Sequence, residues 1–470
     1  MRAFSLLPLL ILAACARGSD APPATAEIPA AYRAISGAAV WPTAEWWRGF
    51  GSAELDGLIA AARIDNFDVQ AAVARVRQAD AQLSLAGAGL LPSVSLGSDA
   101  QWSRAQRVGG GRVSETRSFQ VAPSASWELD VWGKVRAGRD SAQATALASR
   151  FDQQAVALTV VTSVASTWFQ ALALQDRVDI AYRNLNDAEE VLRAIRGRQE
   201  AGTVSQLDVA QQAALAANVR AQIPNLRSQL EQTVNALGVL VGRPPSAITV
   251  RPGTLTNLSL PEISPGLPSA LLARRPDIAT AEAQLVAASA DIRAARAAFF
   301  PSISLTGSAG WQGLALSTLF GPGSFFANAA LSATQPIFDN GSLTAQLALQ
   351  RARHEELLAT YRKTVVQAFT DVENAALAYR YATEQEALTR QAVAVAQQAA
   401  NIAREQVRAG TSDLIQALQA QATLFNDQDL LAQVRLARFQ ALLALYKAVG
   451  GGWTRQDVEA PSVRLFQGVL

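Results

Sequence analysis

LPSVSL at residues 91–96 returns as FPSISL at residues 300–305, and this repetition decides the fold of the chain. The spacing of about 208 residues is far longer than the period of a solenoid repeat. Two further landmarks keep the same order and nearly the same spacing: Ala201-Gly202-Thr203 with Ala409-Gly410-Thr411, and Val241-Gly242 with Val449-Gly450. An internal duplication is therefore predicted, with a first repeat at 31–242, an equatorial linker at 243–268, a second repeat at 269–450 and an equatorial tail at 451–470.

Each repeat is predicted to contain helices of very different length. A stretch of about 24 residues, at 67–90 and at 277–300, stops before the proline of the hexapeptide, because the residue before a proline avoids the helical region. A proline-free segment of about 68 residues follows the strands, at 134–201 and at 341–409, and would form a rod of roughly 100 Å. This length favours a helix that packs in a coiled coil over an ordinary amphipathic core helix. Its apolar stripe has a mean spacing of about 3.5 residues: Leu358, Tyr361, Val365, Phe369, Val372, Ala376 and Tyr379.

Between the short and the long helix, each repeat carries two segments in which apolar and polar residues alternate. They are predicted strands, at about 93–104 and 118–130 in the first repeat and at about 302–312 and 325–335 in the second. The alternation fits a membrane strand with one face on lipid, and it also fits a half-buried soluble sheet. Trp102, Trp127 and Trp311 lie near strand ends, where aromatic girdles belong, and favour the membrane.

Four strands per chain are too few for a closed barrel, since the smallest transmembrane barrels have about eight. An open sheet edge in lipid would leave backbone groups unpaired, at a cost of several kcal/mol for each group. Three copies of the chain would supply twelve strands, so a homotrimer that shares one barrel is predicted. The expected fold class is mainly α with a membrane β-barrel, in which long coiled-coil helices continue the four strands of each chain.

The first 14 residues have the pattern of a secretory signal peptide: a basic Arg2, then an apolar run that ends in small residues. Leu12-Ala13-Ala14-Cys15 resembles a bacterial lipobox, which implies cleavage before Cys15 and acylation of that residue. Residues 15–30 would then be a lipidated tether held by outer-membrane lipid. An ordinary signal peptide that ends near an incidental cysteine is the alternative.

Composition argues against several classes of function. The formal net charge is only +2, so no basic surface for nucleic acid is expected. Cys15 is the single cysteine and His354 the single histidine, which leaves no thiol or imidazole cluster for a metal site or for hydrolysis. The chain is therefore expected to be no enzyme and to need no cofactor. His354 is expected to be a surface side chain of the long helix.

Several motifs resemble one known family, the TolC-like outer-membrane efflux factors. Arg274-Arg275-Pro276-Asp277-Ile278, followed by AEAQL at 281–285 and AFFP at 298–301, is similar to a signature of the lipoprotein branch that serves RND pumps, the NodT type. WELDVWG at 127–133 and PIFDNG at 336–341 are similar to the strand-to-helix junctions of the family. The resemblance spans almost the whole chain, from Trp46 to Gly452.

The resemblance implies a trimer with a twelve-stranded barrel in the outer membrane and a helical tunnel in the periplasm. It also implies a belt around the tunnel, which we expect at 31–60, 243–268 and 451–470. The implied function is passive conduction of small molecules, such as drugs, to the exterior. The implied partners are a periplasmic membrane-fusion adaptor and an inner-membrane RND-type transporter that supplies the energy.

The resemblance further implies a gate at the periplasmic tip, where the helix after the Gly-Thr turn carries polar side chains. Ser412, Gln416 and Gln419 share one face of that helix, and Asp413 could add one carboxylate per chain to a ring that favours cations. Gln416 and Gln419 stand where relatives often carry aspartates, so a doubly acidic constriction is not expected. Asp413 could equally cap its helix, and Asp208 in the first repeat has the same two interpretations.

Two other functions stay open on the sequence alone. The same architecture could secrete proteins, although Cys15 and the Arg-Arg-Pro-Asp motif favour efflux of small molecules. A periplasmic coiled-coil scaffold would explain the long helices but not the four alternating strands.

Overall fold

The computed structural model describes residues 28–34, 40–106, 113–264, 266, 268–409, 411, 414–455 and 458. The predicted signal peptide, Cys15 and the turn residues Ser412 and Asp413 lie outside the described residues. The chain divides into two compact units. One unit contains the strands with 77–148 and 281–362, and the other contains 27–76, 149–280 and 363–470.

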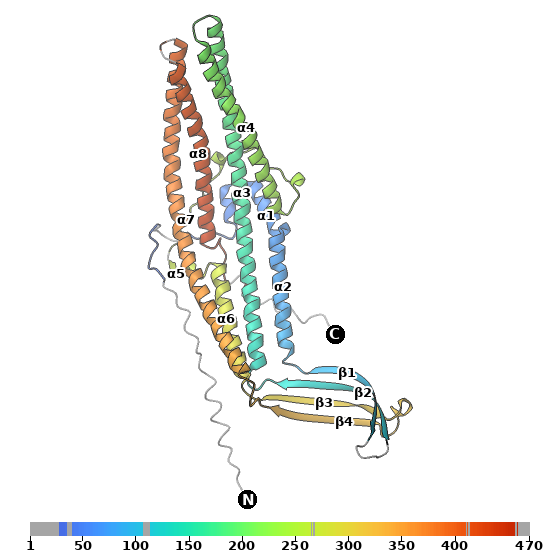
Figure 1. Cartoon of the computed structure of the whole chain (residues 1–470). Helices are drawn as coiled ribbons and strands as arrows, with labels where there is room; N and C mark the ends of the chain where they lie inside the picture. Colours follow the sequence, from blue (N-terminus) through green and yellow to red (C-terminus); the bar gives the residue numbers. More distant parts are fainter. Residues whose placement is uncertain are drawn as a thin grey trace. The chain divides into compact units, whose positions relative to one another are not determined.

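Both repeats contain the same order of elements: a short helix, two strands, a very long helix and a second long helix (Figure 1). The first repeat has α2 (Phe67–Ala88), β1 (Ser93–Gln106), β2 (Val113–Leu129), α3 (Lys134–Glu200) and α4 (Gln206–Val241). The second has α6 (Pro276–Ala297), β3 (Ser302–Gly313), β4 (Phe325–Thr334), α7 (Ser342–Ala409) and α8 (Leu414–Ala448). The predicted helical fold with four strands per chain is therefore confirmed.

The four strands form one antiparallel sheet in the order β1-β2-β3-β4 (Figure 1). The register places Trp127 opposite Leu305 and Val121 opposite Trp311, so the apolar residues of neighbouring strands share one face. β2 begins at Val113, earlier than the predicted start near 118. The ladder continues there because Arg104 on β1 lies opposite Glu115 on β2, a cross-strand pair of opposite charge.

An aspartate joins strand to helix in each repeat, and this explains the two junction motifs. The Asp130 carboxylate accepts hydrogen bonds from the backbone N–H groups of Val135 (2.9 Å) and Arg136 (2.8 Å) at the start of α3. The Asp339 carboxylate accepts a bond of 2.8 Å from the backbone N–H of Leu343 at the start of α7. A carboxylate at this position satisfies donors that the first helical turn leaves unpaired, so each long helix begins directly after its strand.

The second unit has an aromatic core that joins three segments far apart in the sequence. These are the short 3₁₀ helix η2 (Trp46–Phe50), the middle of α3 and the last turns of α8. Trp46 stacks on Tyr446 with ring centroids 4.5 Å apart, and Phe169 lies 4.9 Å from Phe439. α1 (Ala53–Asp65) packs on the same core.

The beginning of the first repeat also contacts the linker between the repeats in this unit. Val40 and Ser264 form an isolated antiparallel bridge, with N–H to O distances of 2.9 and 3.2 Å. The backbone N–H of Arg251 donates to the Glu54 carboxylate at 2.8 Å. A four-residue helix, α5 (Pro268–Leu271), then leads into the second repeat.

The coiled-coil stripe of α7 is buried or half-buried along its whole length, as its spacing predicts. The prediction for His354 is wrong, because this residue is only 3% exposed. His354 precedes the buried Leu358 by four residues, so both side chains project from the same face of α7. The histidine therefore belongs to the packed face of the helix.

Candidate gate and the clusters around it

The first helical hairpin turns between α3 and α4. Gly202 adopts a left-handed conformation (φ 72°), and a capping box begins α4. The Asp208 carboxylate accepts a hydrogen bond from the backbone N–H of Ser205 at 2.8 Å, while the Ser205 hydroxyl accepts one from the backbone N–H of Asp208 at 3.2 Å. The Asp208 side chain thus caps its helix, and a role for it in the gate stays a prediction.

The second hairpin turns between α7 and α8, and it carries the other predicted gate residues. Gln416 and Gln419 are exposed in the first turns of α8, three residues apart on one face. Leu414 between the turn and these residues is buried. Ser412 and Asp413 fall in the turn, outside the part of the chain that the structure describes. The described residues of the predicted gate in this second hairpin are therefore polar and uncharged.

Three contacts join the two hairpins near their tips, and the sequence analysis missed them. Arg404 on α7 lies 3.7 Å from the Asp187 carboxylate on α3, and Arg408 lies 3.7 Å from Glu190. Arg198 on α3 donates from Nη1 to the Val407 carbonyl oxygen at 2.6 Å. The sequence did contain a signal for these ion pairs. Asp187 and Glu190 are three residues apart on one long helix, and Arg404 and Arg408 are four residues apart on the other, so each pair lies on one helix face. We call these contacts the hairpin latch.

The hairpin latch borders a cavity of about 90 Å³ between the hairpins. Two buried glutamines line it: Gln212 on α4 and Gln421 on α8. The Gln212 side chain donates to the Ala188 carbonyl oxygen at 2.8 Å, but its Oε1 atom and the Nε2 atom of Gln421 have no hydrogen-bond partner among the described residues.

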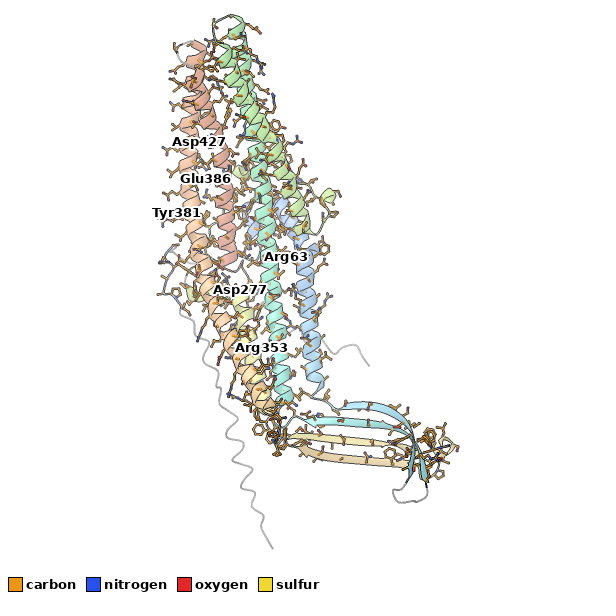
Figure 2. All side chains as sticks on the ribbon, viewed as in Figure 1. Arg63, Asp277, Arg353, Tyr381, Glu386 and Asp427 are labelled. Carbon is orange, nitrogen blue, oxygen red and sulfur yellow. The ribbon has the colours of Figure 1, made fainter. Side chains whose placement is uncertain are left out.

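Farther from the tip, charged clusters join α8 firmly to its neighbours. Arg177 on α3 makes a two-pronged contact with Asp429 on α8, at 2.6 and 3.1 Å. Glu386, labelled on α7 in Figure 2, is almost fully buried. Three arginines donate hydrogen bonds to its carboxylate. The donors are Arg390 (2.6 Å), Arg435 (3.2 Å) and Arg438 (3.0 Å). We call this group the Glu386 cluster.

The Glu386 cluster predicts a loss of stability in acid. Burial raises the pKa of Glu386, but the hydrogen bonds and charges of Arg438 and Arg435 outweigh burial and hold its pKa below the usual 4.5. Because the folded-state pKa is the lower one, the stabilisation is complete above about pH 4.5 and is lost as the pH falls through the folded-state pKa, at about 1.4 kcal/mol per pKa unit. Melting temperature measured between pH 7 and pH 3 should fall less steeply in Glu386→Gln than in the native protein. Glu384→Gln, at an exposed position on the same helix, is the matched control, and an equally flat profile for it would contradict the assignment.

The described residues contain no group of three or more His, Cys, Asp or Glu side chains that could hold a metal ion. The clusters that they do contain pair carboxylates with arginines at distances typical of ion pairs. Such pairs hold helices together, and nothing in their arrangement positions a nucleophile beside a base.

Comparisons with known proteins agree with this arrangement. A family model described as outer membrane efflux protein matches residues 58–243 and 267–451, one segment in each repeat. Pyoverdine export outer membrane protein OpmQ of Pseudomonas putida is 40% identical over 465 residues, which cover 96% of this chain and 98% of that protein. Outer membrane protein OprJ of Pseudomonas aeruginosa is 33% identical, over 96% of this chain and 95% of that protein.

Solved structures of outer-membrane channels show the same fold. The structure of the open state of the MtrE channel of Neisseria gonorrhoeae has a TM-score of 0.83 and 30% identity, over 92% of this chain and 97% of that chain. The outer-membrane channel OprN has a TM-score of 0.86 and 27% identity, over 93% of this chain and all of that chain (100%). Since the family model, the relatives and the fold agree over both repeats, this chain belongs to the outer membrane efflux protein family.

Proposed function

We propose that three copies of this chain form the outer-membrane channel of a tripartite efflux pump, which conducts small molecules passively from the periplasm to the exterior. The observation that carries this proposal is the sheet of four strands. β1 and β4 each pair on one side only, and the apolar residues of the sheet share one face. Such a sheet is stable in lipid only if other strands close it, and three chains would supply twelve.

The proposed assembly has a defined set of partners. The helical hairpins would meet a periplasmic membrane-fusion adaptor at their tips, and an inner-membrane RND-type transporter would supply the energy. Acylated Cys15 would hold the mature N-terminus in outer-membrane lipid. The segments at 31–60, 243–268 and 451–470 would form the belt around the tunnel, which the contacts of Val40 with Ser264 support.

The relatives support a channel for varied cargo. Their names refer to pyoverdine, toluene, antibiotics and cations, although each is 30–40% identical to this chain over 89–97% of its length. We therefore assign the choice of cargo chiefly to the inner-membrane transporter and only its passage to this protein.

Single-channel conductance of the purified protein in a planar lipid bilayer tests the channel. Discrete conductance steps are expected, and Asp413→Ala should enlarge them or reduce their preference for cations if Asp413 forms the proposed ring. If the conductance steps do not change in Asp413→Ala, the constriction lies at other residues. A membrane-inserted trimer without conductance, even when the hairpin latch is removed, would contradict the channel itself.

We propose that the hairpin latch stabilises the closed state of the channel, which predicts a variant that opens it. Each exposed ion pair contributes only about 0.2–1 kcal/mol, so Arg404→Ala with Arg408→Ala should weaken the closed state by about 1 kcal/mol per chain. If all three chains open together, about 3 kcal/mol per trimer shifts the ratio of open to closed channels on the order of 100-fold. Single-channel open probability measures this shift.

Salt provides an independent check on the hairpin latch. Exposed ion pairs are screened at high ionic strength, so native channels should open more often at about 1 M salt. The difference in open probability between the native channel and the Arg404→Ala, Arg408→Ala double variant should therefore become smaller. The matched control is Arg193→Ala with Arg196→Ala, two arginines near the same end of α3. Equal opening in the latch variant and the control would contradict the latch.

A further inference from the structure

The apolar face of the sheet, which would point outward in the proposed barrel, carries two groups of aromatic side chains. Trp127 and Trp132 lie near the helical end of the strands, and Trp132 stacks on Phe300 with centroids 4.9 Å apart. Trp102, Phe119 and Trp311 lie near the other end. Phe119 and Leu129 are about ten residues apart on β2, which is about 33 Å along the strand. At the usual strand tilt of about 40° in a membrane barrel, this corresponds to about 25 Å along the membrane normal. This is the height of the apolar band between two girdles.

Beyond the second girdle, the same face of β1 and β2 becomes charged. Arg104 follows Trp102 by two residues, and Arg117 precedes Phe119 by two, so all four side chains project from one face. Arg117 lies opposite Trp102 in the ladder, and Arg104 lies opposite Glu115. Arg104 and Glu115 form an ion pair of 3.6 Å in which both side chains remain about half exposed (59% and 49%). Arg117 is exposed and has no carboxylate partner within the described part of the chain.

Chain connectivity decides on which side of the membrane these arginines lie. β1 starts and β2 ends at the helices, and in this family the helical tunnel is periplasmic. The opposite ends of the two strands therefore lie at the extracellular surface. In the proposed barrel, Arg104 and Arg117 would therefore lie at the level of the outer-leaflet headgroups, next to the aromatic girdle.

Within the sheet, charged side chains occur on β1 and β2 but not on β3 and β4. Residues 302–335, which contain β3, β4 and their connection, include no Asp, Glu, Lys or Arg. A shallow hollow of about 400 Å³ also lies beside Arg117, and Trp102, Phe119 and Ala100 line it. Apolar and cationic side chains therefore meet at one point, as an amphipathic anion requires.

We propose that Arg104 and Arg117 bind a phosphate group of the anionic glycolipid in the outer leaflet, at one site per chain. The guanidinium groups form charge-assisted hydrogen bonds to the phosphate, and the hollow beside Trp102 and Phe119 receives the adjoining apolar part of the lipid. Glu115 opposes binding, because its carboxylate competes with the phosphate for Arg104.

Binding of lipid A to the purified trimer in detergent, measured by native mass spectrometry, tests the site. Each arginine near an anionic lipid surface contributes about a 5-fold gain in affinity, so Arg104→Ala with Arg117→Ala should weaken binding about 25-fold. Arg77→Ala with Arg227→Ala, which removes two exposed arginines of α2 and α4, should leave binding unchanged. Lipid A without phosphates should bind the native protein and the double variant equally weakly.

Two further variants keep the test independent of folding and of channel function. Glu115→Gln should tighten binding about 5-fold, a gain that a misfolded protein cannot produce. Arg104→Lys with Arg117→Lys should bind more tightly than the Arg→Ala double variant and less tightly than the native protein, because an ammonium group keeps the charge but not the fork of a guanidinium. Equal affinity of the Arg→Ala double variant and the native protein, or equal binding of lipid A with and without phosphates, would overturn the proposal. The variants should conduct normally, so a failure of this site is separable from a failure of the channel.

Discussion

Arg275→Ala is expected to lower the free energy of unfolding by about 3 kcal/mol, because it removes a charge that holds three segments together. The Arg275 guanidinium binds Asp277 at 2.6 Å, Asp371 on α7 at 3.0 Å and the carbonyl oxygen of Ala448 at 3.2 Å. Arg275 is only 8% exposed, whereas the side chains of Asp277 and Asp371 are 39% and 36% exposed. In the variant, water can solvate the two carboxylates. The loss of unfolding free energy is therefore expected at the lower end of the about 3–5 kcal/mol that removal of one partner of a buried ion pair costs.

Thermal unfolding of the purified protein in detergent would measure this loss. Arg274→Ala is the matched control: its guanidinium lies over the Trp41 ring at 4.4 Å and binds no carboxylate in the described structure. We expect a loss of no more than about 1 kcal/mol there. Arg275→Lys should recover only part of the stability, because an ammonium group cannot reproduce the two-pronged contact of the guanidinium with both oxygens of Asp277. Equal melting temperatures for the Arg275 and Arg274 variants would show that the motif has another purpose.

Gly450→Ala is expected to destabilise the same junction by about 3 kcal/mol or more. Gly450 ends the α8 segment with φ 92°, a conformation that costs a residue with a side chain about 1–3 kcal/mol. A Cβ atom there would also overlap the carbonyl oxygen of Arg274, so the backbone of the junction would have to move. Strain and overlap act together at this glycine, and both oppose the native packing.

A second glycine separates the two causes. Gly202 in the first hairpin turn has a similar φ of 72°, but nothing lies within 4 Å of an added Cβ atom. Gly202→Ala should therefore show the conformational cost alone, about 1 kcal/mol. Melting temperatures of the two variants, measured side by side, give the contribution of the close approach by difference. If the two losses were equal, the contact with Arg274 would contribute nothing.

The two predictions concern a single junction and explain two features of the sequence. The Arg-Arg-Pro-Asp motif at 274–277 meets the end of α8 through the Arg275 contact and through the close approach of Arg274 to Gly450. Gly242 closes α4 in the same way: it has φ 73°, and an added Cβ atom would overlap the backbone of Asp65. The Val-Gly landmark of each repeat thus marks a helix end that packs closely against another segment.

Local patterns in the sequence determined the duplication, the four strands and the two long helices. Period-two alternation and a proline-free run act over a few neighbouring residues, so they can be read without knowing the fold. The capping box of Ser205 and Asp208 is equally local, because its two residues are three positions apart. Lipid-facing alternation also indicated a shared barrel, since an unpaired edge in lipid is unfavourable wherever it occurs.

Only the tertiary structure decided which charged residues meet. Arg404 pairs with Asp187 and Glu386 with Arg435, across 217 and 49 residues of sequence, and no local pattern relates such partners. The burial of His354, by contrast, could have been predicted, because this residue precedes Leu358 by four positions and so continues the apolar stripe. The periodicity of apolar residues specifies which face of a helix or strand is buried and how long that element is. The partner of each side chain is specified by the packing of distant segments, because ion pairs form only where that packing brings opposite charges within about 4 Å.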